Sequence, residues 1–472
     1  MKIDSRRTVR RAYRRILATF VGALLPAAVA AQQPPATGPA VSLTRLADVY
    51  GAVVRSNPKV AAAQALVRAA EARVPGARRP ADPQLQLGFM NYTLPRLAPM
   101  EPLGMTQLQL MQMVPLGGKL RLAGRVASAQ AAATGARARD VTWELRSQAA
   151  MAFYDLWAAD RQLGVERETL RLLQDIARTA ESMYRVGEGR QADVLRAQVE
   201  IARMVEDTLR MQAMRSSMLA RLNALLDRDA AAAVGSPVIP DFPDSLPARA
   251  WLDSVAVGGR PMIRAGLEEV RAADAQATLA RRELIPDLTV GVQYGRAPVT
   301  MQRLDAEGTP MSERKTENMG SLMIGASIPI FARSRQLQMR IEMNAMKAMA
   351  EADVAAMRAE TRGRIGETYA SLTRARNLQR LYRTTVLPQA EATVASALSA
   401  YRVGQVDFMT LLDSRMTVNK YREELAQLVA DEGEAWAELE MLTGRELLDA
   451  STVATDTTNG LAPSAPARGG AR

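Results

Sequence analysis

The chain of 472 residues contains no cysteine and no histidine. It therefore cannot form disulfide bonds, thiolate zinc sites or imidazole metal sites, and it lacks the Ser–His and Cys–His pairs that activate catalytic nucleophiles. An enzyme built on carboxylates alone would need a compact acidic pair within a recognisable motif, and the sequence offers none. We expect a protein that is not an enzyme and that has no catalytic residues, no metal site and no cofactor.

Aromatic residues make up only 4% of the chain, whereas a nucleic-acid-binding surface combines dense basic side chains with aromatic ones. The formal net charge is +11. Much of this charge lies at the N-terminus, because residues 1–31 contain seven Lys or Arg and one Asp. The remainder carries a net charge of about +5. We therefore expect that nucleic acid is not a partner.

The basic N-terminus is followed by an apolar run over residues 16–31, in which Ala28-Val29-Ala30 precede the end. A charged segment, an apolar run and a small-residue cleavage site are typical of a secretory signal peptide. After residue 31, no stretch approaches the roughly 18 consecutive apolar residues of a membrane-spanning helix. If the exported protein enters a membrane, it must therefore cross as a β-barrel.

The remaining chain contains an internal duplication. Residues 67–89 align without a gap on residues 270–292, and the sequence Tyr-Arg-Val-Gly at 184–187 recurs at 401–404. The offset between the halves grows along the chain, so that insertions fall in the loops. We predict five segments: a signal peptide at 1–31, a first repeat at 32–227, a connector at 228–256, a second repeat at 257–446 and a disordered tail at 447–472.

Each half changes its hydrophobic period from helix to strand and back to helix. Residues 57–79 are rich in alanine and end at Pro80, which predicts a helix. Apolar and polar residues then alternate over 85–90 and 107–110, and the second half repeats this pattern over 288–295 and 321–328. The alternation predicts four strands of about 8 to 10 residues with one apolar and one polar face.

Long helical hairpins follow the strands in both halves. No proline occurs between Leu116 and Gly235, and the only turn signal is Gly187-Glu188-Gly189, which predicts two antiparallel helices. The first helix would have about 70 residues and a length of about 100 Å. Gly404 marks the second hairpin, whose first helix Pro388 should kink.

The hairpin helices show the seven-residue spacing of coiled coils. In the first helix, Glu166 interrupts this pattern. The positions that fit a seam are Leu163, Leu170, Leu173, Ala177, Ala180 and Tyr184 on the first helix, and Val194, Ala197, Ile201, Met204, Met211, Met218, Leu222 and Leu225 on the second.

These elements and motifs, in this order, resemble the TolC-like outer-membrane efflux protein family over nearly the whole chain after residue 31. The motifs are Asn57-Pro58 at a helix start, Pro115-Leu116-Gly117-Gly118-Lys119 after a strand, and the duplicated Tyr-x-x-Gly turn. The resemblance implies a mainly α fold with a membrane β-barrel. Three protomers, each giving four strands, would form a 12-stranded barrel that continues into a long periplasmic α-helical coiled-coil tunnel.

The resemblance also implies a location and partners. The protein would lie in the outer membrane with a periplasmic extension, as a homotrimer in contact with outer-membrane lipid. Its further partners would be a periplasmic adaptor protein and an inner-membrane pump. The resemblance leaves open whether the duct conducts pumped solutes or exported proteins, and a periplasmic coiled-coil scaffold without a channel is the alternative from another class.

Two sets of site residues follow from the resemblance. Six residues at the two hairpin ends would dock the adaptor: Arg185, Val186, Gly187, Arg402, Val403 and Gly404. Three residues match the family's periplasmic gate, Asp193, Tyr401 and Asp413, and Asp407 would join the gate by adding charge nearby. Two positions depart from the family, because Thr410 replaces an acid found in some relatives and Val406 replaces the usual Arg partner of the gate.

The chain contains 25 methionines. A helical stripe of Met339, Met343, Met346 and Met349 could bind soft ions such as Cu(I) or Ag(I). Methionine also fills helical seams, as Met204 and Met211 are expected to do. We favour this packing interpretation.

Overall fold

The computed structural model describes residues 43–93, 95, 98–100, 104–304 and 310–448. These residues belong to one structural unit that starts at Leu43. The predicted signal peptide and the predicted tail from residue 449 onward lie outside the described residues.

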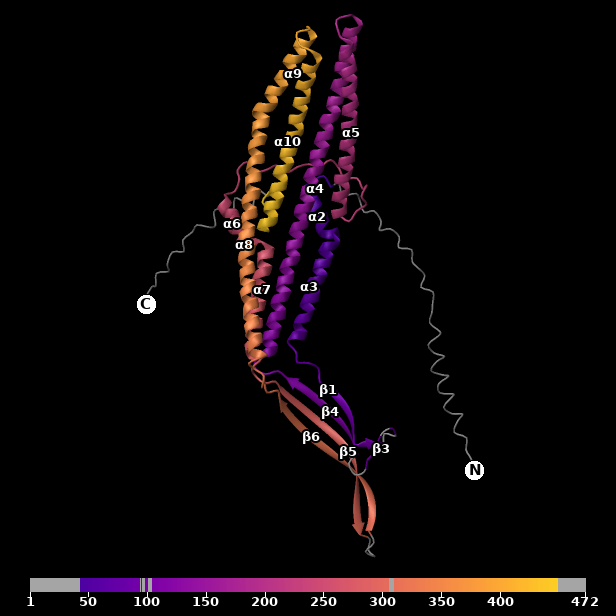
Figure 1. The fold of residues 1–472 in the computed structure, drawn as a ribbon, viewed down its shortest axis with the longest axis vertical. Helices are drawn as coiled ribbons and strands as arrows, with labels where there is room; N and C mark the ends of the chain where they lie inside the picture. The colour runs from indigo at the N-terminus through magenta and orange to yellow at the C-terminus, as the bar shows by residue number, and fades with distance from the viewer. Residues whose placement is uncertain (1–42, 94, 96–97, 101–103, 305–309, 449–472) are drawn as a thin grey trace, which may run out of the picture. The chain divides into compact units, whose positions relative to one another are not determined.

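The first half of the chain forms helices, strands and a helical hairpin in turn (Figure 1). Its elements are α2 (Leu46–Ser56), α3 (Pro58–Ala77), β1 (Gln84–Met90), β2 (Tyr92–Thr93), β3 (Ala98–Pro99), β4 (Met105–Val114), α4 (Lys119–Arg185) and α5 (Gln191–Leu225). The second half gives α6 (Arg249–Gly259), α7 (Pro261–Arg282), β5 (Leu288–Leu304), β6 (Pro310–Ala326), α8 (Gln336–Leu381), the π-helical turn η1 (Tyr382–Val386), α9 (Leu387–Arg402) and α10 (Phe408–Thr443).

The prediction of a mainly helical fold with four long antiparallel strands is confirmed. Helix α4 has 67 residues, close to the expected length. Proline stands at the first position of α3 and of α7, where a missing N–H leaves no intrahelical bond unmade. Asn57 caps α3 by accepting from Lys59 N at 2.9 Å and fixes the helix to the end of α5 by donating to Leu225 O at 2.8 Å.

The four long strands form one antiparallel sheet in the order β1-β4-β5-β6. Strands β5 and β6 have 17 residues each, longer than predicted. Their pairing continues beyond β1 and β4, from Ala297 opposite Glu317 to Leu304 opposite Pro310. In the described chain, the outer parts of β5 and β6 pair only with each other. They lack the alternation of apolar and polar residues from which the strand lengths were predicted.

The two faces of the sheet differ sharply in polarity. Leu85 pairs with Leu110, Leu110 with Val292, and Val292 with Leu322, so that an apolar row crosses all four strands. Leu85 is 66% exposed and Leu322 is 69% exposed. On the other face, a polar row of Gln86, Gln109, Gln293 and Ser321 follows the same register. A single chain therefore leaves the apolar face of the sheet uncovered.

The sheet is fixed to the helices by a buried lysine. Gly117 and Gly118 adopt φ angles of +71° and +73°, which bring the chain from β4 into α4. Lys119 is only 6% exposed, and its Nζ donates to Ile285 O at 2.9 Å and to Asp287 Oδ1 at 2.8 Å. The start of α4 is thereby joined to the segment that leads from α7 into β5.

The helices lie side by side, with α4 in contact with α3, α5, α7 and α10 (Figure 1). Among the described residues, no helix is both long enough and apolar enough to cross a membrane. Near Pro388 the regular helix gives way to η1, because proline lacks an N–H and its ring displaces the carbonyl one turn before it. Figure 1 shows α9 inclined to α8 at this point, as the sequence predicted.

Of the fourteen positions predicted for the seam of the first hairpin, six are buried and seven are half-buried. Leu163, Leu173 and Ala180 are buried on α4, and Ala197, Met204 and Leu222 are buried on α5. Tyr184 was wrongly placed in the seam, because it is 45% exposed in the last turn of α4.

Candidate functional site at the hairpin ends

The end of the first hairpin is closed by a glycine in a left-handed conformation. Gly187 has a φ of +83°; its N–H donates to Tyr184 O at 3.1 Å, and Glu188 N donates to Met183 O at 2.9 Å. These two bonds form a Schellman motif, which satisfies the last carbonyls of a helix and needs a residue with positive φ.

The second hairpin ends in the same way. Gly404 has a φ of +73°; its N–H donates to Tyr401 O at 3.0 Å, and Gln405 N donates to Ala400 O at 2.9 Å. The repeated Tyr-Arg-Val-Gly sequence therefore encodes two matching helix ends.

The six predicted docking residues all lie on the exposed ends of the hairpins. Val186 and Val403 are each 69% exposed. A Cβ atom added to Gly187 or Gly404 would have no heavy atom within 4 Å. Each end thus presents an apolar side chain between an exposed arginine and an open glycine.

Two of the predicted gate residues come together between the hairpins. Tyr401 is 7% exposed and packs in a cluster with Leu173, Ala197 and Phe408, with its ring 6.1 Å from that of Phe408. Burial, followed by the negative charge of Asp193, raises the pKa of the Tyr401 hydroxyl. Asp193 of the first hairpin therefore lies close to Tyr401 of the second.

The other two gate residues lie apart from this cluster. Asp407 caps α10 by accepting from Thr410 N at 3.0 Å and from Thr410 Oγ1 at 2.5 Å, and these bonds lower the pKa of its carboxyl. Asp413 is exposed, and with Thr410 it lines a groove of about 600 Å³ between α9 and α10. Asp193 and Tyr401 thus lie close together between the hairpins, whereas Asp407 and Asp413 are exposed.

Arg196 is a site residue that the sequence reasoning missed. Its positive charge helps to lower the pKa of Asp407, so that opposite charges face each other across the two hairpins. The sequence signal that could have identified Arg196 is its position one turn after Asp193 on α5. Val406, at the position of the expected Arg partner, is half-buried and packs against the Tyr401 cluster.

Two further hollows lie among the helices that adjoin the sheet. Three methionines of the predicted stripe, Met343, Met346 and Met349, line a groove of about 520 Å³. No group of three or more Asp or Glu in the described chain is placed to hold a metal ion.

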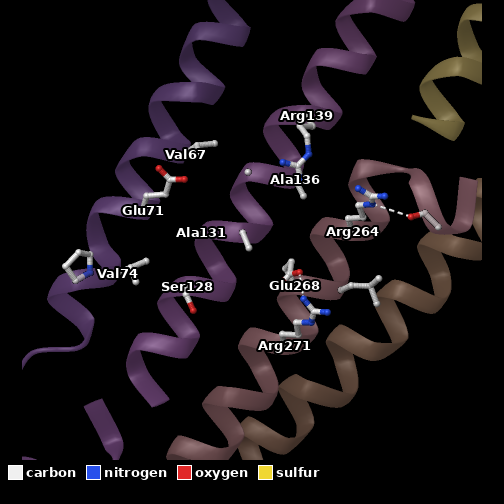
Figure 2. A pocket seen from close by; sticks show the side chains of 15 residues that line it. Val67, Glu71, Val74, Ser128, Ala131, Ala136, Arg139, Arg264, Glu268 and Arg271 are labelled. Carbon is white, nitrogen blue, oxygen red and sulfur yellow. Dashed lines mark hydrogen bonds and ion pairs between the residues drawn. The ribbon is translucent and has the colours of Figure 1, made fainter. Parts of the chain in front are cut away.

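The larger hollow, of about 1030 Å³, lies over α4 between α3 and α7 (Figure 2). Its floor is formed by small residues of α4, among them Ala131 and Ala136, and charged side chains such as Glu71 and Arg139 stand around it (Figure 2). Arg264 Nε donates to Gly258 O at 3.3 Å in its wall. Small side chains on α4 leave this space open in the single chain.

Comparison with solved structures supports the same fold. The chain is similar to the outer-membrane channel OprN, with 20% identity and a TM-score of 0.66 over 84% of this chain and 89% of that chain. It is similar to the outer membrane protein VceC of Vibrio cholerae, with 19% identity and a TM-score of 0.70 over 85% and 96%. It is also similar to CusC, a protein that forms a transmembrane channel, with 18% identity and a TM-score of 0.66 over 85% and 92%.

No curated protein sequence matches the chain. The family described as outer membrane efflux protein matches residues 49–228 and 253–445, which together form most of the chain. The chain therefore belongs to the outer membrane efflux protein family, a family of outer-membrane channels with a periplasmic helical extension and no enzymatic activity.

Proposed function

We propose that three copies of this chain form the outer-membrane channel of a tripartite efflux system. Solutes would pass through it passively, and an inner-membrane pump would supply the energy. The observation that carries the proposal is a four-stranded sheet that, among the described residues, has one uncovered apolar face and two open edges and is joined directly to two long helical hairpins.

The sheet supports both the membrane location and the trimer. Strands β1 and β6 each have one edge without a partner in the described chain, and lipid offers no hydrogen bonds to such an edge. Pairing β6 of one copy with β1 of the next satisfies both edges. Three copies then close a sheet of twelve strands, with the Leu85 row toward outer-membrane lipid and the Gln86 row toward a water-filled path.

The hairpins support a continuation of this path into the periplasm. Helix α5 packs on α4, α4 on α10 and α10 on α9, which leaves α5 and α9 at the two sides of each protomer. Helix α5 carries exposed Leu195, Val199 and Leu209, at 54%, 57% and 61% exposure. Burying this stripe against the next copy would extend the contact between protomers from the sheet along the helices.

The duplication supports a quasi-sixfold periplasmic end. We treat 32–227 and 257–446 as two repeats separated by the connector 228–256. The two matched stretches of the family, 49–228 and 253–445, support this division. Three chains would then present six similar hairpin ends.

These six ends are the proposed docking sites for the periplasmic adaptor, which would connect the channel to the inner-membrane pump. Val186 and Val403 offer the same exposed apolar contact at each end. Since Gly187 and Gly404 have no neighbour over their Cα atoms, a partner backbone can approach closely there.

The gate would lie just above these ends. Asp193 and Tyr401 would hold the two hairpins of a chain together when the entrance is narrow. Asp413 is exposed near the entrance, so that a trimer would carry a ring of three carboxylates, with Asp407 adding charge close by. Such a ring attracts cations and repels anions.

Native mass measurement of the detergent-extracted protein, together with solute accumulation in cells that lack it, tests the proposal. We expect a trimer, and accumulation that is reversed by the intact gene. A stable monomer under conditions that preserve other outer-membrane trimers would contradict the architecture. A trimer whose loss changes no solute accumulation would instead favour a scaffold.

A further inference from the structure

Two pairs of acidic residues face each other where the two hairpins of one chain meet. Helices α4 and α10 run antiparallel and pack together. Glu166 of α4 hydrogen-bonds to Glu423 of α10, and Glu434 of α10 hydrogen-bonds to Asp155 of α4. The pairs are separated by eleven residues on both helices, which is about three helical turns. The same register therefore produces both pairs.

The pair nearer the hairpin ends faces a further acidic group and an arginine. Glu166 is 9% exposed and faces Glu423 from α10 and Asp207 from α5. The positive group that faces it is Arg210 of α5, which also binds Asp207 at 2.5 Å. Burial, followed by the charge of Glu423, raises the pKa of Glu166 to about 7, and burial raises the pKa of Glu423.

The second pair has the same character. Glu434 faces Asp155 from α4, Asp431 from its own helix and Arg221 from α5. Asp431 is in turn 3.7 Å from Arg374 of α8. Burial, followed by the charge of Asp155, raises the pKa of Glu434 to about 8.

A neighbouring ion pair on α4 differs from these two carboxyl pairs. Asp160 lies on α4 between Asp155 and Glu166, and it forms an ion pair with Arg215 of α5. Within the first hairpin, α4 is therefore held to α5 by opposite charges. Between the hairpins, α4 meets α10 through the two carboxyl pairs and also through Glu168, whose carboxylate is 3.2 Å from Arg422 and 3.7 Å from Arg415. Two carboxyl groups can share a hydrogen bond only while one of them keeps its proton.

We propose that these two carboxyl pairs make the contact between the two hairpins of each chain dependent on pH. With one proton in each pair, Glu166 donates to Glu423 and Glu434 donates to Asp155, and the hairpins stay together. When the protons are lost, two pairs of negative charges within this contact repel and the hairpins separate at their ends. This device regulates the periplasmic entrance, a step that rests on the proposed function.

The direction of the effect follows from proton linkage. Each raised carboxyl binds a proton in the packed state at pH values where a free glutamate has lost it. The packed state is therefore favoured at mildly acidic pH, and it weakens as the pH rises through about 7 and about 8. Above both values the penalty is complete.

The distance between the hairpin ends within one chain tests the proposal directly. Since the chain has no cysteine, Val186→Cys and Val403→Cys would provide the only thiols for two spin labels. Pulsed electron resonance on protein assembled with excess unlabelled chain then reports one pair of ends. Between about pH 5.5 and pH 9, we expect the distance to lengthen, with the change complete by about pH 8.

Charge-neutral variants separate the two pairs. Glu166→Gln with Glu434→Gln keeps a donor toward each partner, so we expect the short distance at all pH values. With Glu434→Gln alone the change should be complete by about pH 7, and with Glu166→Gln alone by about pH 8. Glu181→Gln, an exposed change on α4, is the matched control and should respond like the wild type.

An unchanged distance in the wild type, or a persisting response in the double variant, would overturn the proposal. The labels report structure without transport, so a protein that conducts nothing would still show the distance change. Conversely, if the distance does not change with pH, trimer assembly and conductance can still be observed, so the proposed function would stand.

Discussion

Replacing the glycine at either hairpin end should loosen that end by a predictable amount. An alanine Cβ at Gly187 or Gly404 would have no heavy atom within 4 Å, so steric crowding adds nothing to the cost. The cost comes from the φ angles of +83° and +73°, which disfavour an L residue by about 1 to 2 kcal/mol. Gly187→Ala and Gly404→Ala should therefore each raise the open population of one end.

Limited proteolysis measures this population, because Arg185 and Arg402 place trypsin sites at the two ends. When the ends open and close faster than trypsin cuts, the cleavage rate follows the open population. We expect roughly 5- to 30-fold faster cleavage at the altered end, while the trimer persists. The unaltered end of the same protein serves as an internal reference.

Gly164→Ala is the matched control with the opposite sign. Gly164 lies inside α4 and also has open space over its Cα atom, and alanine in a helix interior is more stable than glycine by about 0.5 to 1 kcal/mol. It should not accelerate cleavage at Arg185. Wild-type cleavage rates in both end variants would refute the reasoning that left-handed glycines fix the hairpin ends.

Three further changes test other parts of the account. Lys119→Met leaves Asp287 without its buried cation and should cost about 3 kcal/mol, so the trimer should dissociate at a lower temperature; an unchanged temperature would mean that this contact does not fix the sheet to the helices. Tyr401→Phe or Asp193→Ala should raise single-channel conductance by loosening the contact between the hairpins. Wild-type conductance in both variants would mean that Tyr401 and Asp193 do not hold the entrance closed. Asp413→Ala should reduce the cation selectivity measured from reversal potentials. Unchanged selectivity would mean that Asp413 does not line the entrance.

Local chemistry in the sequence was sufficient to predict several elements. The repeated Tyr-Arg-Val-Gly predicted two similar turns, because the left-handed residue that closes a helix is usually glycine. The alternation around Leu85 and Val292 predicted strands with unlike faces. Pro388 predicted the interruption of the last long helix. In each case the physical cause acts within a few residues of the signal.

Features that depend on distant partners could not be predicted. Glu166 stood out as a break in the seven-residue pattern, but its partner Glu423 is brought to it only by the register between α4 and α10. Tyr184 and Tyr401 occupy identical motifs, yet the first is 45% exposed and the second 7%. The difference depends on which helix packs beside each motif, and no local pattern encodes that.

The central claim, that three copies enclose a continuous water-filled path, is tested most directly by current through single assemblies in planar lipid bilayers. Purified trimers should give discrete and long-lived conductance steps with cation selectivity. Trimers that insert into the bilayer and produce no steps would contradict the account.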